Sequence, residues 1–210
     1  MATMKKKFKS IIKYGLGTLL VIIIVAFSVF AQKDISKEVL VKKYATGNSK
    51  FMSIMGMQVH YRDEGNPLDS IPLVLIHGTS SSLHTWEKVT KQLNDAKYGH
   101  KRVISLDMPA FGLTGPNLEN SYGYDNYTQV IDSLLIKLNV KKCMIGGNSL
   151  GGGIAWHYTV ALPQKVSKLI LIDASGYPKK GEKGSLGFKI AQIPVINLSL
   201  IHISEPTRRS

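Results

Sequence analysis

Cysteine is nearly absent from this 210-residue sequence, in which Cys143 is the sole example. A single cysteine excludes an internal disulfide, and its place in an apolar run predicts a small buried residue. No group of His, Cys, Asp or Glu stands at the spacing of metal ligands, and no cofactor motif is visible. The glycine-rich stretch at 146–152 lacks the Gly-Lys-Ser/Thr that a phosphate loop requires. We therefore expect neither a metal nor a cofactor.

Acidic residues are also scarce, with 14 against 27 basic residues and a net charge of +13. The imbalance is concentrated in residues 1–50, which hold ten lysines and two acids, whereas residues 51–198 hold fifteen basic and eleven acidic residues. The second part is only mildly basic and has no basic stripe with interleaved aromatic residues. The composition therefore predicts one globular domain and no nucleic-acid partner.

The N-terminal region differs from the rest of the chain. Five lysines between residues 5 and 13 precede an uncharged run over 14–31. Such a run predicts a transmembrane helix or a cleavable signal segment, and a buried core helix is a third interpretation. The poor Ala-x-Ala match of Val29-Phe30-Ala31 favours an uncleaved anchor, followed by a linker over 32–49. Five further lysines follow the run, so the charges do not decide the orientation, but we expect the domain outside the cytoplasm.

Strand-like and helix-like stretches alternate over residues 50–177. A hairpin around Gly56 is predicted over 50–62, and it places His60 on the strand surface. Further strands are predicted at 71–76, 102–106, 143–146 and 166–172, and helices at 85–94, 125–139 and 152–162. Trp86, Val89 and Leu93 are expected on one face of the first of these helices, and Asp125 or Asn126 is a candidate cap of the second. The pattern predicts an α/β fold with a mostly parallel sheet and helices on both faces. Ligands of such sheets bind at the carboxyl ends of the strands.

A possible nucleophile lies in Gly147-Asn148-Ser149-Leu150-Gly151, between a predicted strand and a predicted helix. This pattern is typical of a nucleophile elbow, in which a sharp turn lifts a serine hydroxyl out of the backbone. Gly147 and Gly151 leave room for the turn, and the N-terminus of the following helix offers N–H groups to a developing negative charge.

Three motifs together resemble the α/β-hydrolase family over residues 50–178. They are His77-Gly78-Thr79, the loop Asp107-Met108-Pro109-Ala110-Phe111-Gly112, and the elbow around Ser149. The resemblance implies a serine nucleophile at Ser149 and an oxyanion hole made by the backbone N–H groups of Thr79 and Leu150. Ala110 departs from the family, which often has glycine there. A serine at 149 disfavours the relatives that use an aspartate nucleophile and leaves hydrolysis of an ester, thioester, amide or C–C bond of a small molecule.

A serine nucleophile at Ser149 needs a general base, which the family supplies as a histidine after the serine in the chain. Only His157 and His202 follow Ser149; His157 lies about 12 Å of helical rise away, and His202 stands near the end of the sequence. Asp173 is a candidate acid, although the same turn is commonly structural in the family. Residues 178–198 resemble the start of a helical cap, and 199–210 resemble translated adapter sequence. The sequence therefore predicts an inactive fragment of a serine hydrolase, with a non-catalytic, membrane-tethered binding protein as the alternative.

Overall fold

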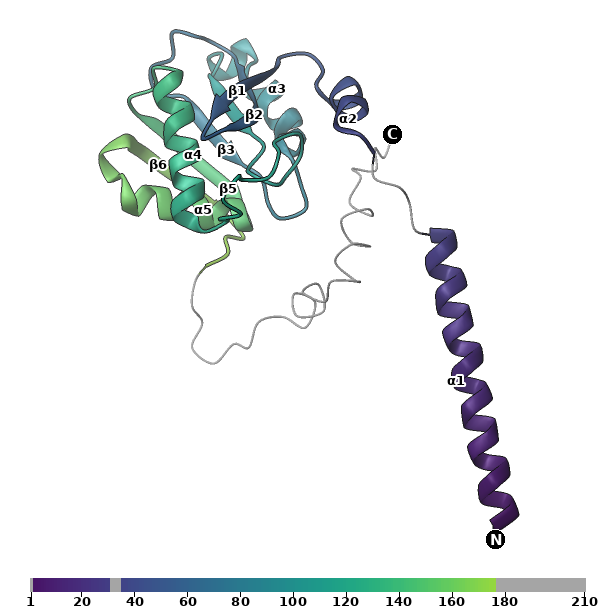
Figure 1. Cartoon of the computed structure of the whole chain (residues 1–210). Coiled ribbons are helices and arrows are strands. Elements are labelled where there is room, and N and C mark those ends of the chain that lie inside the picture. The colour runs from purple at the N-terminus through teal and green to yellow at the C-terminus, as the bar shows by residue number, and fades with distance from the viewer. Residues whose placement is uncertain (1, 31–34, 177–210) are drawn as a thin grey trace.

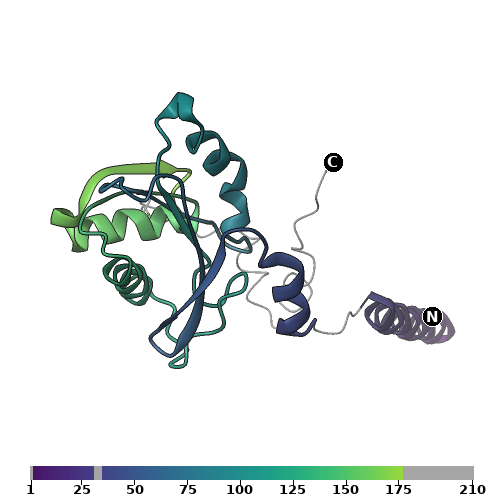
Figure 2. The same cartoon turned by 90° about the horizontal axis from the view of Figure 1, so that it is seen from above.

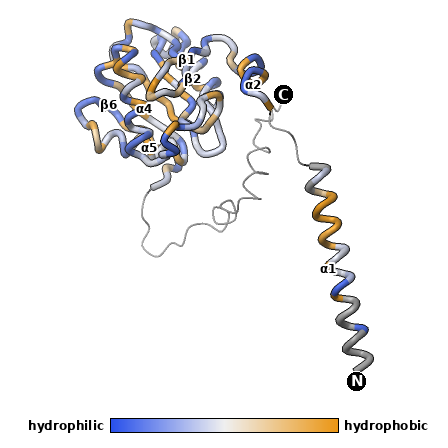
Figure 3. The backbone as a smooth tube through the Cα atoms, viewed as in Figure 1, coloured by the Kyte–Doolittle hydropathy of each residue, from blue (hydrophilic) through white to orange (hydrophobic). Residues whose placement is uncertain are grey.

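The computed structural model describes residues 2–30 and 35–176 (Figure 1). The predicted cap and tail lie outside these residues. Two helices come first, α1 (Ala2–Phe30) and α2 (Lys37–Tyr44). Figure 3 shows the apolar residues of α1 gathered toward its C-terminal half. Within the described ranges, no helix is both long enough and apolar enough to cross a membrane, so the transmembrane helix predicted over 14–31 is not supported.

A six-stranded mixed sheet forms the centre of the domain. Its strands are β1 (Ser49–Ile54), β2 (Met57–Glu64), β3 (Leu73–Ile76), β4 (Val103–Leu106), β5 (Cys143–Asn148) and β6 (Val166–Ile172). They are ordered β1-β2-β4-β3-β5-β6. The pairs β1–β2 and β2–β4 are antiparallel, and β4, β3, β5 and β6 run parallel. The predicted α/β sheet is confirmed.

Helices cover both faces of this sheet, because buried strands alternate their side chains between the faces. Val74 and Ile76 of β3 join a cluster with α4 (Tyr124–Lys137) and α5 (Leu150–Ala161). Leu73 and Leu75 face the other way, onto Trp86. Trp86 belongs to the 3-10 helix η1 (Leu83–Trp86), and Leu93 of α3 (Glu87–Leu93) packs against the same cluster. A second 3-10 helix, η2 (Ala96–Tyr98), follows α3 and has no buried residue. In Figure 2, α3 and the pair α4–α5 lie on opposite sides of the sheet. A short 3-10 helix, η3 (Pro163–Lys165), leads into β6.

Three local predictions are wrong. Val89, expected on the inner face of its helix with Trp86, is exposed: Trp86 is buried as predicted, but it ends a 3-10 turn, and Thr90 instead of Val89 faces inward in the helix that follows. Helix α4 has Gly123 at its N-cap, with no side-chain cap, instead of Asp125 or Asn126. His60, expected on the strand surface, is fully buried.

The two edges of the sheet differ in exposure. On the hairpin edge, the outer strand β1 is only partly buried, and the turn from β1 to β2 is formed by Met55 and Gly56, both with positive φ. On the other edge, the large side chains of β6 are exposed by about two fifths: Leu169 37%, Ile170 41%, Leu171 37% and Ile172 41%. Among the described strands, β6 pairs with β5 alone, so its outer edge has no strand partner there.

Candidate active site

Ser149 connects β5 to α5 with unusual backbone angles. Its φ of 52° and ψ of −117° lie outside the regions that residues with a side chain normally adopt. Backbone hydrogen bonds hold it there: its N–H donates to Ile172 O (3.0 Å), and its carbonyl accepts from the N–H groups of Gly153 (3.0 Å) and Ser175 (2.9 Å). A strained residue held on both sides is typical of functional turns.

The glycines beside Ser149 are required by space. A Cβ built on Gly147 would overlap the backbone of Gly151, and a Cβ on Gly151 would overlap the carbonyl oxygen of Ile76. Both collisions involve main-chain atoms, which cannot rotate away. The steric role that the sequence assigns to these two glycines is therefore consistent with the packing of β3, β5 and α5.

The loop after β3 approaches the elbow closely. A Cβ on Gly78 would stand 3.3 Å from Ser149 Cβ and 3.1 Å from Asn148 Oδ1. Thr79, the next residue, is exposed. The carbonyl of Gly78 and the N–H of Thr79 belong to one planar peptide unit, so whatever holds that carbonyl also sets the direction of the Thr79 N–H.

His77 holds that carbonyl. Its buried ring has Nδ1 2.8 Å from Gly78 O, and its Nε2 accepts from the N–H of Met108 (3.1 Å). Because Nε2 accepts a hydrogen bond, the proton sits on Nδ1 and the ring is neutral. Burial lowers the pKa of His77 further than the nearby Gly78 carbonyl and Asp107 raise it, which agrees with a neutral ring.

Leu150 is the first residue of α5 and is half-buried. The N–H groups of a first helical turn have no partner within their own helix, so they can donate to a ligand. The residues of both predicted oxyanion donors, Thr79 and Leu150, therefore lie in the segments that meet at Ser149.

Asp173 follows β6 directly, with a positive φ of 44° and an exposed side chain. Its neighbours Ile172 and Ser175 both hydrogen-bond to the backbone of Ser149. No hydrogen bond or ion pair of Asp173 is found in the described part of the chain. Its position is that of a turn residue beside the elbow.

No hydrogen bond of the Ser149 hydroxyl is found among the described residues. Among residues 35–176, no hydrogen bond joins its hydroxyl to a histidine. His157, which the sequence already placed too far along the helix, instead lies 3.2 Å from Thr128 Oγ1 and 3.4 Å from Asp125 Oδ1. The elbow therefore has the strained turn, with the segments of Thr79 and Leu150 beside it, and no histidine hydrogen-bonded to Ser149 within the described residues.

The loop after β4 is organised by the buried carboxylate of Asp107. Oδ1 accepts from the N–H of Leu83 (2.7 Å), and Oδ2 accepts from the N–H of Leu113 (2.8 Å) and lies 2.7 Å from His60 Nδ1. Burial raises the pKa of Asp107, but the hydrogen bond from His60 and the two backbone N–H donors outweigh it, so the pKa lies below its usual value. Asp107 is therefore ionised at neutral pH.

Two further positions of this loop have special backbones. Gly112 has a φ of 51°, and a Cβ there would overlap the Asp107 carboxylate. Ala110, where the family often has glycine, has a φ of 67°. The glycine preference has a physical basis at this position, because a Cβ is unfavourable in the left-handed region.

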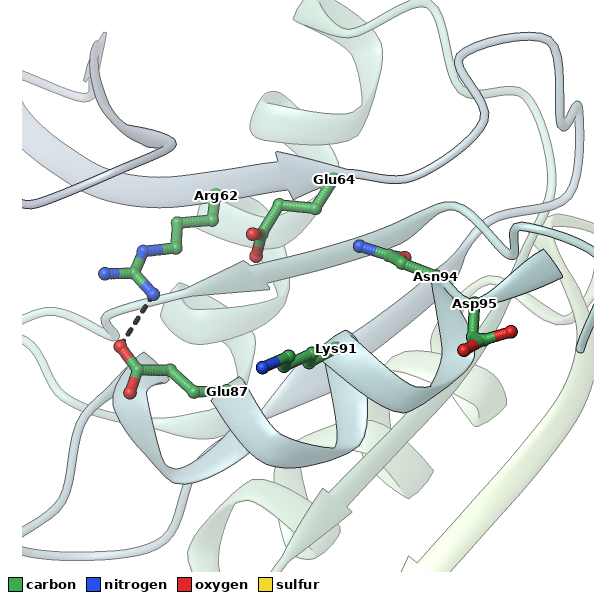
Figure 4. A pocket seen from close by; sticks show the side chains of 6 residues that line it. All are labelled: Arg62, Glu64, Glu87, Lys91, Asn94 and Asp95. Atoms are coloured by element: carbon green, nitrogen blue, oxygen red, sulfur yellow. Dashed lines mark hydrogen bonds and ion pairs between the residues drawn. The ribbon is translucent and has the colours of Figure 1, made fainter. Parts of the chain in front are cut away.

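Two cavities of the described residues lie away from Ser149. One, of about 410 Å³, is lined by Arg62 and Glu64 of β2, by Glu87, Lys91 and Asn94, and by Asp95 (Figure 4). A second, of about 390 Å³, lies beside the loops at 67–70 and 138–141. Neither contains Ser149, Thr79 or Leu150 in its lining.

Comparison with known proteins agrees with this architecture. Residues 71–186, more than half of the chain, match the family model described as alpha/beta hydrolase fold. The chain therefore belongs to the α/β-hydrolase family.

Individual relatives are hydrolases of several kinds. The chain is 34% identical over 128 residues to a Bacillus subtilis hydrolase named YugF, covering 61% of this chain and 45% of that protein. It is 27% identical to 2-hydroxy-6-oxononadienedioate/2-hydroxy-6-oxononatrienedioate hydrolase 1 of Pseudomonas putida, covering 59% and 44%. A structure from a study of Nitrososphaera gargenis carboxylesterases matches with a TM-score of 0.60 and 25% identity, covering 70% and 53%. The chain thus spans less than half of the two curated relatives' length.

Proposed function

We propose that this chain contains the nucleophile half of a serine hydrolase acting on an ester, thioester, amide or C–C bond of a small molecule. The observation that carries the proposal is the strained backbone of Ser149, held between β5 and α5 beside the loop that contains Gly78. Relatives named as a 2-hydroxy-6-oxononadienedioate hydrolase and as carboxylesterases support hydrolysis of a small molecule.

In this proposal, the hydroxyl oxygen of Ser149 attacks the carbonyl carbon of the substrate. The N–H groups of Thr79 and Leu150 donate to the oxygen that becomes negatively charged. Residue 77 contributes by fixing the peptide unit that carries the Thr79 donor. A base must take the Ser149 proton, and the family supplies a histidine for it.

We further propose that the 210-residue chain by itself does not turn over substrate. The reason is the lack of a histidine in contact with Ser149 among residues 35–176. Loss of the base leaves only the stabilisation that oxyanion donors and binding provide. Free imidazole in solution can stand in for the missing base.

The test is labelling with a p-nitrophenyl phosphonate, located by mass spectrometry with and without imidazole. We expect a phosphonyl adduct on Ser149 whose rate rises with imidazole concentration and which is lost in Ser149→Ala. Ser133→Ala, at a half-buried serine of α4, is the matched control and should keep the adduct.

An unlabelled Ser149 at every imidazole concentration would contradict the proposal. It would favour the second candidate, a non-catalytic α/β-hydrolase-like binding protein, for which the lack of a base near Ser149 is the supporting observation. Turnover of an ester without imidazole that is lost in Ser149→Ala would instead refute the predicted inactivity.

A further inference from the structure

A second serine lies in a hydrogen-bonded chain with a histidine and a carboxylate. Ser49 Oγ stands 2.9 Å from His60 Nε2, and His60 Nδ1 stands 2.7 Å from Asp107 Oδ2. Ser49 begins β1, His60 lies in β2 and Asp107 follows β4, so the three come from separate segments. This is the order of contacts in which a serine nucleophile, its base and the group that orients the base are arranged.

The protons in this chain can be assigned. An ionised carboxylate only accepts, so Nδ1 of His60 carries the proton that binds Asp107. In the neutral ring, Nε2 is then an acceptor, and the partner available to it is the hydroxyl of Ser49. The oxygen of Ser49 in turn accepts from Nε of Arg62 (3.2 Å). Every donor in the chain therefore meets an acceptor, with His60 poised to receive the Ser49 proton.

The surroundings favour a negative charge on the Ser49 oxygen. The guanidinium of Arg62 is fixed beside it by Glu87 Oε1 (2.8 Å) and by the Thr46 carbonyl (3.2 Å). The ring of Phe51 stacks on the ring of His60, with 5.0 Å between the centroids, and helps to hold it in place. A cation next to an oxygen stabilises its deprotonated form.

Ser49 is adjacent to a residue that lines a cavity, although its own side chain is not in that lining. Ser49 is half-buried, and Arg62, its neighbour, lines the cavity of about 410 Å³ drawn in Figure 4. Charged side chains dominate that cavity: Arg62, Glu64, Glu87, Lys91 and Asp95. Such a lining suits short acyl groups better than long apolar chains.

We propose that Ser49 is a second nucleophilic serine, with His60 as its base and Asp107 as a positioning residue, and that it accepts short acyl groups from activated esters. With p-nitrophenyl acetate, the bond between Ser49 Oγ and the acetyl carbon forms as the bond from that carbon to p-nitrophenolate breaks. The Ser49 proton passes to His60 Nε2 and from there to water.

The experiment treats the 210-residue chain with p-nitrophenyl acetate and locates the acetyl group by mass spectrometry. We expect acetylation of Ser49 about 100-fold faster than of Ser53, since a positioned base contributes about 10²–10⁴-fold. Ser53 is the matched control, because it is an exposed serine of the same strand. In Ser49→Ala the acetylation is lost.

Thiol variants give a second readout. At pH 7, Ser49→Cys should react with iodoacetamide at least about 10-fold faster than Ser53→Cys, because Arg62 and His60 stabilise a thiolate. The native thiol gives a low background, since burial raises the pKa of Cys143 to about 11. Equal rates of the two variants would overturn the inference.

The outcome is separable from that of the proposed function. An unmodified Ser49 after complete consumption of the ester overturns the second nucleophile, whatever happens at Ser149. Acetylation of Ser149 alone would also overturn the second nucleophile, but it would support the proposed hydrolase. Acetylation of Ser49 alone would support the second nucleophile and would give no support to Ser149 as a nucleophile.

Discussion

The two ends of the sheet each present a serine, but they provide different parts of a catalytic site. At the β5–β6 end, Ser149 has the strained turn and nearby backbone donors, yet no histidine within the described residues contacts it. At the β1–β2 end, Ser49 sits in a regular strand and contacts His60, which contacts Asp107. A turn that exposes a hydroxyl and a base that activates it are thus separable features of a fold.

The ends also differ in how they are stabilised. The hairpin end relies on a buried hydrogen bond between His60 and the ionised Asp107 carboxylate, whose side chains are both fully buried. The elbow end relies on close main-chain packing of glycines, next to a strand with exposed apolar side chains. Substitutions at the two ends should therefore change the free energy of unfolding by different amounts and with a different dependence on pH.

The largest effect is expected at the hairpin end. His60→Phe keeps the ring and its stacking on Phe51 but leaves the Asp107 carboxylate without its partner, so unfolding free energy should fall by about 3–5 kcal/mol. His84→Phe, which removes a pair with the half-exposed Glu87, should cost about 1 kcal/mol or less. Urea denaturation measures the free energy of unfolding of both variants. Equal losses would show that the buried His60–Asp107 pair contributes no more to stability than the more exposed His84–Glu87 pair.

A smaller difference in stability is expected between substitutions of a leucine in the inner strand β4 and a leucine in the edge strand β6. Leu106→Ala in β4 removes a fully buried side chain and should cost about 3 kcal/mol. Leu171→Ala in β6 removes a side chain that is already 37% exposed and should cost about 1 kcal/mol. Chemical unfolding of the two variants measures the difference, and a cost for Leu171→Ala as large as that for Leu106→Ala would mean that another surface covers β6.

The smallest effect is a pH dependence at the elbow end. Burial lowers the pKa of His77 in the folded state, so its contribution to stability is complete above its ordinary value of 6.5 and is lost as the pH falls below it. The pKa of Asp107 is lowered too, but from 3.8, so the contribution of Asp107 to stability should be lost only below about that pH.

Urea midpoints between pH 7.5 and 5 test this difference. As the pH falls, we expect the free energy of unfolding to decrease by at most about 1.4 kcal/mol per pH unit, the limit for binding of one proton. The slope should become shallower in His77→Gln, whose amide can both donate and accept, and should persist in His100→Gln, at an exposed position. An unchanged slope in His77→Gln would assign the decline to other groups.

Local sequence determined much of this protein. Continuous apolar runs such as 73–76 specify strands buried on both faces, and the leucine and isoleucine spacing over 124–137 specifies a helix, because both patterns act over neighbouring residues. Gly147 and Gly151 mark the elbow because only glycine fits where two backbones meet. The family and the position of Ser149 follow from these short-range signals.

Tertiary structure decided what no local pattern encodes. His60 reads as an alternating strand residue, and its burial against Asp107, 47 residues away, depends on β2 pairing with β4. The inner face of α3 and the uncapped start of α4 depend in the same way on packing over the sheet. Contacts between distant segments carry no periodicity along the chain, so the Ser49–His60–Asp107 chain became visible only when the strands were placed side by side.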